Sequence, residues 1–295
     1  MTKISPRVDI AFKKIFGVEE NKDLLISLIN SIVSKEDQVS EVTLLNPYNP
    51  KHFKRDKLSI VDIKARNSEG KRFNIEIQIS DEADYDKRAL YYWAKLYTEQ
   101  LQVAEDYSKL SKAIGIHILN FLSIPESKKY HNVFHITEKE NHGQYFKDLE
   151  LHTIELKKFT DDSNEELPAI ISKIKSKLDV WAAFLTRYDL FNLSNLPKEL
   201  KDETSLKKAI KVLDVMNFNA DEREAYEGHL KWLRVEANTL KKTREEGLEE
   251  GIEKGMEKGI EKVAINMLKQ NIDIKLVAQV TGLSIDELNK IKASN

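Results

Sequence analysis

The chain contains no cysteine and no long hydrophobic run. Without cysteine, neither disulfide bonds nor thiolate chemistry can contribute, and a reducing cytoplasm is the expected setting. Apolar runs such as AIGIHIL are far shorter than the roughly 20 residues that a membrane-spanning helix needs, so no membrane segment is expected. The first residues, MTKISPRVDIAFKKIF, also lack the apolar core of a secretory signal peptide.

Some motifs of catalysis and ligand binding are absent as well. The sequence contains no glycine-rich phosphate loop and no GxSxG motif, so nothing in it indicates ATP use or serine hydrolysis. His131 and His135 lie in a predicted strand, where a spacing of four residues separates side chains by roughly 13 Å, so no zinc site is expected. The net charge of -2 excludes a uniformly basic nucleic-acid-binding protein, although residues 1–80 hold a small excess of Lys and Arg.

The order of the expected elements indicates an α/β core with a mixed sheet, followed by an all-helical region. The core elements are two amphipathic helices before residue 34, a hairpin over about 58–80, a long helix over 81–107, a buried strand over 112–122 and further strands up to about residue 159. We therefore divide the chain into a core (1–160), a helical domain (161–240), a Gly/Glu/Lys repeat that forms a helix or a tether (241–262), and a C-terminal helix pair (263–295).

The hairpin, KLSIVDIKARNSEGKRFNIEIQIS, has an unusual polar face. Its turn, NSEGK, carries Gly70 where a three-residue loop needs a left-handed residue, and this pairs Asn67 with Lys71. In that register Asp62 lies opposite Glu76. Gln78 is on the same face, because side chains alternate along a strand. The sequence therefore predicts two carboxylates within reach of each other.

Like charges that lie directly opposite each other destabilise a sheet. Lys64 and Arg66 are on the same face and could neutralise them. A divalent cation is the other interpretation, since paired carboxylates form an oxygen site of the kind that Mg²⁺ prefers. Such an ion would acidify water and polarise a phosphodiester. For the hairpin taken by itself, a solvated polar face is the simpler explanation.

Four segments, in their order along the chain, resemble the PD-(D/E)XK nuclease superfamily. The closer resemblance is to its Rpn branch, the recombination-promoting nucleases or PD-(D/E)XK nuclease family transposases. The segments are DIAFKKIFG with NKDLLISLINSIV, VDIKARNSEGKRFNIEIQ, RALYYWAKLYTEQL, and the Gly/Glu tail with TGLSIDEL. The resemblance implies a restriction-endonuclease-like core and a DNA endonuclease that depends on Mg²⁺, or on Mn²⁺.

The resemblance also implies roles for individual residues. Asp62 and Glu76 would bind the metal, and Gln78 would take the third position of the motif, where the superfamily more often has lysine. Glutamine does not titrate, so it would orient water or a phosphate oxygen while the metal activates the water. Asp9 matches an acidic residue on the first helix of the superfamily. The alternative for Asp9 is an acid that complements the helix dipole.

Several residues are candidates for contact with DNA. Each has a simpler alternative, namely an amphipathic helix surface, a solvated loop or the apolar stripe of a helix. They are Lys13 on the first helix, Lys54 and Arg55 in the loop KHFKRDK, and Arg88 with Tyr92 on the helix after the hairpin.

Near the C-terminus, glycine recurs every four residues. The row is Gly247, Gly251, Gly255 and Gly259, each followed by an apolar residue. A glycine inside a helix costs about 0.5–1 kcal/mol relative to alanine, and a partner helix packed against the row would offset this. The repeat therefore predicts a homo-oligomer, with a disordered tether as the alternative.

The expected function is a metal-dependent DNA endonuclease of the recombination-promoting type. One alternative is a non-catalytic DNA-binding or self-assembly module that keeps the nuclease fold. Another is a component of a mobile element that acts only with partners. Cleavage that depends on metal would separate the enzyme from the non-catalytic module.

Overall fold

The computed structural model describes residues 4–48, 62–81, 84–161, 164–216 and 218–294. The chain forms two compact units, Met1–Leu230 and Lys231–Asn295. The loop that carries Lys54 and Arg55 lies outside the described residues, so their predicted contact with DNA stays a prediction.

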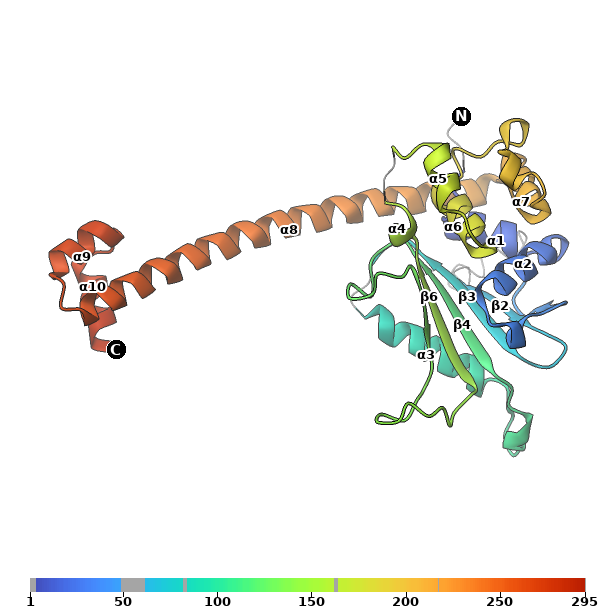
Figure 1. The fold of residues 1–295 in the computed structure, drawn as a ribbon, viewed down its shortest axis with the longest axis horizontal. Helices are drawn as coiled ribbons and strands as arrows, with labels where there is room; N and C mark the ends of the chain where they lie inside the picture. The colour runs from blue at the N-terminus through green and yellow to red at the C-terminus, as the bar shows by residue number, and fades with distance from the viewer. Residues whose placement is uncertain (1–3, 49–61, 82–83, 162–163, 217, 295) are drawn as a thin grey trace. The chain divides into compact units, whose positions relative to one another are not determined.

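A mixed sheet forms the centre of the first unit, which confirms the predicted α/β core (Figure 1). In the described residues its strands run in the order β1-β2-β3-β4-β6-β5. The first three are antiparallel, β3, β4 and β6 are parallel, and β5 is antiparallel to β6. Their bounds are β1 Thr43–Leu44, β2 Asp62–Arg66, β3 Arg72–Gln78, β4 Ala113–Leu119, β5 His131–Phe134 and β6 Leu149–Glu155.

The hydrophobic core lies on one face of this sheet. It combines strand residues such as Ile63, Ile75 and Ile116 with the apolar sides of the helices on that face. These helices are α1 Asp9–Phe16, α2 Lys22–Ile32, α4 Leu156–Phe159, α5 Leu167–Lys173, α6 Lys177–Arg187 and α7 Thr204–Asp214. The central strand β4 is buried at every position, as expected of a parallel strand that is covered on both faces.

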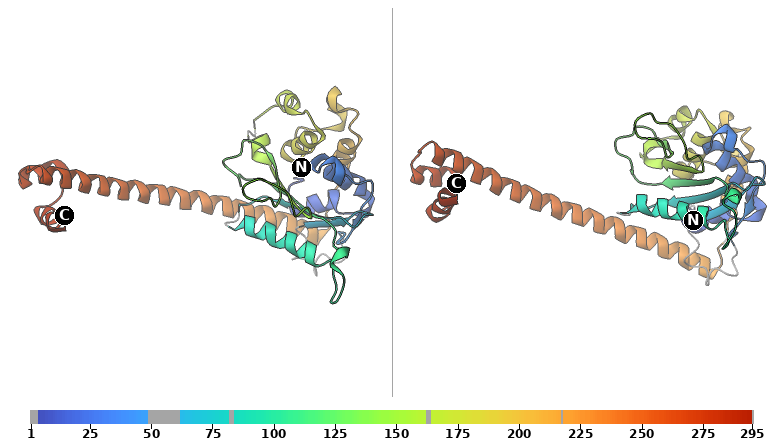
Figure 2. Two further views of the ribbon diagram at one scale, coloured as in Figure 1. Left: turned by 60° about the horizontal axis from the view of Figure 1, so that its bottom comes forward. Right: turned by 90° about the horizontal axis from the view of Figure 1, so that it is seen from below.

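The opposite face of the sheet is covered by α3, Tyr85–Thr98 (Figure 2). Tyr85 and Ala89 pack there against Leu119 and Phe121. The helix ends sooner than its amphipathic pattern predicts, because the Gln100 amide bonds both backbone groups of Ser111, at 2.8 and 3.0 Å. These bonds turn the chain back toward β4, and the expected helix over 81–107 is thus wrong in its last part, after Thr98.

The described residues after β6 contain helices but no strand, as the predicted helical C-terminal region requires. Helices α5 to α7 share the core of the sheet, and the first compact unit reaches Leu230. The domain limits at residues 160 and 240 stay a prediction about which segments fold by themselves.

The second unit is a small helical assembly. It holds the later part of α8 (Ala220–Lys269), α9 (Ile274–Thr281) and α10 (Ile285–Ser294), around a core of Ala264, Val277 and Leu288. Asp273 caps α9 with bonds to two backbone N–H groups, and Gly282 ends it in the left-handed conformation at φ 74°. No described helix is long and apolar enough to cross a membrane.

Candidate active site

The hairpin has the predicted register. Asp62 pairs with Glu76, and Asn67 N–H donates to the carbonyl oxygen of Lys71 at 3.0 Å. Gly70 closes the turn at φ 90°, where other residues are strained, and its N–H donates to the Asn67 carbonyl at 3.2 Å. Asp62 and Glu76 therefore sit opposite each other on adjacent antiparallel strands, as the turn predicts.

The polar face of the hairpin is largely buried. Glu76 is 2% exposed and Gln78 is 8% exposed, while Asp62 is partly exposed. The side chain of Asn46 fixes the backbone here, because its amide donates to the Asp62 carbonyl at 3.1 Å and its oxygen accepts from Lys64 N–H at 2.7 Å. The carboxylates are thus held on a rigid strand pair and not on a loop.

Asp9 lies in the first turn of α1. Burial and, to a smaller extent, the charge of Glu76 raise the pKa of its carboxyl to about 7, although Arg88 and a backbone hydrogen bond oppose the shift. The charge of Asp9 is therefore coupled to those of Glu76 and Arg88. An acid stabilised chiefly by the helix dipole would have a lowered pKa, so the raised value shows that burial outweighs the dipole at Asp9.

Arg88 connects the two motif residues of β3. Its Nη2 donates to the Glu76 carboxylate at Oε1 and to Gln78 Oε1 at 3.3 Å. The guanidinium also lies over the rings of Tyr85 and Tyr92, with 5.6 and 5.9 Å to the ring centroids. Arg88 is therefore not a simple surface charge of α3, and it neutralises Glu76 from across the sheet face. The Lys64 ammonium instead lies 3.6 Å from Glu99.

His117 is a member of the cluster that the sequence did not indicate. It pairs with Glu76 in the parallel register of β3 and β4 and is 1% exposed. Its Nδ1 lies 3.9 Å from Glu76 Oε2 and 2.9 Å from the Tyr85 hydroxyl. Burial, together with Arg88 and His152, lowers the pKa of His117 to about 4, so the imidazole is neutral at pH 7. The only signal in the sequence is a histidine inside the apolar run AIGIHIL.

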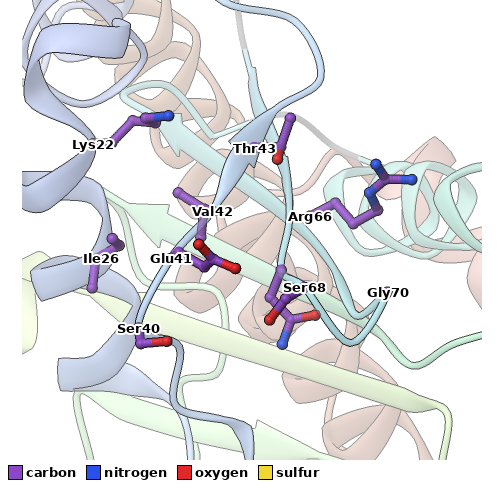
Figure 3. Close-up of a pocket in the computed structure, with 10 residues that line it drawn as sticks. Lys22, Ile26, Ser40, Glu41, Val42, Thr43, Arg66, Ser68 and Gly70 are labelled. Carbon is purple, nitrogen blue, oxygen red and sulfur yellow. The ribbon is translucent and has the colours of Figure 1, made fainter.

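The remaining candidates differ in accessibility. Tyr92 is partly exposed one turn after Arg88. Lys13 is 4% exposed, so its ammonium has no open path to DNA in this conformation. A surface pocket beside the hairpin turn is lined by residues of α2, β1 and the turn, and it contains none of the predicted site residues (Figure 3).

The donor set of the cluster fits a hard cation. Asp62, Glu76 and Asp9 offer carboxylate oxygens, the ligands that Mg²⁺ and Mn²⁺ prefer. Within the described ranges, no three acidic or histidine side chains are yet close enough together to hold a metal ion. The backbone positions of Asp62 and Glu76 are set by β2 and β3, and that of Asp9 by α1.

Comparison with known proteins gives one family. The model of the PD-(D/E)XK nuclease family transposases matches residues 6–243, a range that contains Asp9, the hairpin and α3. Neither the curated proteins nor the solved structures contain a match to the chain.

Proposed function

We propose that this chain, which belongs to the PD-(D/E)XK nuclease family transposases, is a metal-dependent DNA endonuclease that hydrolyses phosphodiester bonds. The observation that supports it best is the pairing of Asp62 with Glu76, with Gln78 on the same face of β3. The family match supports a catalytic role for this face over that of a solvated polar surface.

Each side chain of the site has its own proposed role in the hydrolysis. Asp62 and Glu76 would hold Mg²⁺, or Mn²⁺, through carboxylate oxygens, and Asp9 supplies a third carboxylate beside Glu76. When bound, such a cation supplies Lewis-acid polarisation of the phosphodiester and a more acidic water. The Gln78 side chain donates to a phosphate oxygen or accepts from the attacking water, and it positions either one without taking a proton.

The substrate would approach along the α3 side of the hairpin. Arg88 is partly exposed there, and an arginine fork suits a phosphate group. Tyr92, one turn further along α3, can contact the same strand of DNA, and Lys54 and Arg55 are the candidates on the loop before β2. The absence of cysteine agrees with a reaction in the cytoplasm.

The direct test is nicking of a supercoiled plasmid by the purified full chain. We expect relaxed circles to form with Mg²⁺ or Mn²⁺ and none to form in EDTA. DNA binding that is the same with and without metal, and is never followed by nicking, would instead support a non-catalytic module.

A second copy of the chain is the proposed partner of the glycine repeat on α8. In the described part of the chain, no atom outside the helix lies within 4 Å of a Cβ added at Gly247, Gly251, Gly255 or Gly259. Leu248, Ile252 and Met256 beside them are exposed. Residues four apart form the ridges and grooves of helix packing, so the apolar row of one copy can enter the glycine row of the other.

Sedimentation equilibrium tests this partner. Gly251→Leu fills the groove and should shift the chain to monomers. Gly228→Leu, at an equally open position on α8 outside the repeat, is the matched control and should not. Wild-type protein that is monomeric at every concentration would leave the tether as the better explanation of the repeat.

A further inference from the structure

The carboxylate of Glu76 has a cationic partner within the chain. Arg88 reaches it from α3 and contacts Gln78 with the same nitrogen. The Glu76 side chain is 2% exposed, whereas that of Arg88 is 25% exposed. The guanidinium thus lies on the solvent side and covers the carboxylate oxygen that an entering cation would use.

We propose that Arg88 is a built-in counterion of Glu76, that a divalent cation displaces it, and that the released guanidinium then binds a phosphate of the substrate. This inference rests on the proposed function, because it takes Glu76 to be a ligand of the cation. It adds an order of events, in which binding of the metal frees the group that receives the DNA.

The two cations exclude each other at Oε1 of Glu76, the oxygen that Arg88 contacts. A guanidinium and a divalent ion that both contact Oε1 would repel each other strongly, since screening is weak in a buried site. A buried carboxylate with no cation at all is also strongly unfavourable. Glu76 therefore keeps Arg88 when metal is absent and exchanges it for the metal when metal arrives.

The surroundings of Arg88 provide a second place for the guanidinium. The rings of Tyr85 and Tyr92 lie on either side of it along α3, and aromatic rings attract a guanidinium. Tyr85 is buried and Tyr92 is partly exposed, so a shift toward Tyr92 moves Arg88 outward. Its five N–H donors then match the oxygens of a phosphate group.

The first measurement is titration of the full chain with MnCl₂ by calorimetry, without DNA. Arg88→Gln should bind Mn²⁺ about tenfold more tightly than wild type, because one competing charge-assisted hydrogen bond is gone. Lys87→Gln is the matched control. It removes a positive charge next to Arg88, but that ammonium is exposed and pairs with Asp84, so the affinity should change by less than about twofold.

The second measurement separates exchange from simple repulsion between Arg88 and the metal. In EDTA, Arg88→Gln should unfold several degrees below wild type, because buried Glu76 loses its counterion. Saturating Mn²⁺ should remove most of this difference, since the metal replaces Arg88 in both proteins. In a Glu76→Gln background, Arg88→Gln should have little further effect in EDTA. Simple repulsion predicts no loss of stability in EDTA.

The outcomes separate this inference from the proposed function. If wild type binds Mn²⁺ through Glu76 and Arg88→Gln binds it no more tightly, the exchange is wrong while the metal site stands. If neither protein binds Mn²⁺ in a way that Glu76→Gln abolishes, both proposals are wrong. Binding by Arg88→Gln alone supports the exchange.

If Arg88→Gln does not fold, Arg88→Lys, which loses the fork, takes its place. A tighter affinity then supports the exchange, and an unchanged affinity overturns it.

Discussion

Two glutamates of the first unit are equally buried, at 2% exposure, yet their surroundings differ. Glu222, in the first turn of α8, accepts from Lys14 through both oxygens, at 2.9 and 2.8 Å. It also accepts from the Tyr48 hydroxyl and from Asn219 N–H, the latter at 2.8 Å. These bonds outweigh the effect of burial and lower the pKa of Glu222. Its carboxylate is saturated with donors.

Glu76 belongs to the opposite kind of cluster. Asp62 faces it, burial and the charge of Glu76 raise the pKa of Asp9 to about 7, and neutral His117 adds no positive charge. Arg88 and a backbone hydrogen bond of Asp9 oppose the rise in its pKa. The two glutamates are equally buried but differ in the groups that surround their charge. Glu222 accepts from several fixed donors, whereas Glu76 lies opposite a second acid and has the partly exposed Arg88 as its cationic partner.

The largest expected effect comes from removing the Glu222 carboxylate and its bonds to Lys14 and Tyr48. Glu222→Ala leaves Lys14 without its buried partner and should lower the free energy of unfolding by about 3–5 kcal/mol. Urea denaturation measures it. Glu224→Ala, at an exposed acid two residues further on, should change stability by less than about 0.5 kcal/mol. Equal effects of the two variants would mean that the start of α8 does not hold α1 as described.

The stability that Glu222 provides also has a predicted pH dependence. Its pKa in the folded protein is below the ordinary value of 4.5. The contribution is therefore present above that value and is lost as the pH falls through the lowered pKa. The difference in stability between wild type and Glu222→Gln should shrink under those acidic conditions.

The contribution of Asp9 to stability should depend on pH in the opposite sense. Its folded pKa, about 7, lies above the ordinary 3.8, so its effect on stability is most favourable below 3.8 and is lost as the pH rises through 7. Asp9→Asn should therefore stabilise the protein in EDTA at pH 8 by about 2 kcal/mol, a value reduced for partial exposure, and by almost nothing at pH 4. If Asp9→Asn is less stable than wild type at pH 8, Asp9 instead acts as an acid that complements the dipole of α1.

Among Glu222, Asp9 and Gln78, substitution of Gln78 should have the smallest effect. Gln78→Ala removes an orienting hydrogen bond but no charge, so nicking should slow by roughly tenfold. Gln78→Lys restores the residue that the superfamily more often has and should leave an active enzyme. Initial rates of plasmid nicking at saturating Mg²⁺ compare them. A complete loss in Gln78→Ala would show that the amide does more than position a group.

The local part of the site could be predicted from the sequence. Gly70 and the alternation of side chains fix the hairpin register, because both act within a few residues. The sequence alone therefore predicts that Asp62, Glu76 and Gln78 share one face, and the strand pairing agrees.

The rest of the site depends on contacts that the sequence does not encode locally. His117 reaches Glu76 only through the parallel pairing of β3 and β4, whose register no turn specifies. Arg88 reaches it only because α3 packs on that face, and Glu222 meets Lys14 across 208 residues of chain. The early end of α3 likewise follows from bonds between Gln100 and Ser111, which an amphipathic pattern does not reveal.

The central claim is that the carboxylate face of the hairpin is a catalytic metal site. The most direct test compares Asp62→Ala with Glu69→Ala, an exposed acid in the turn of the same hairpin, by nicking of supercoiled plasmid in Mg²⁺. Asp62→Ala should lose more than about 100-fold in rate, since even outer-shell partners of metal ligands contribute 10–100-fold. Glu69→Ala should keep the wild-type rate, and circular dichroism should show both folded. Full activity in Asp62→Ala would contradict the account, because the paired carboxylates would then be no more than a polar face.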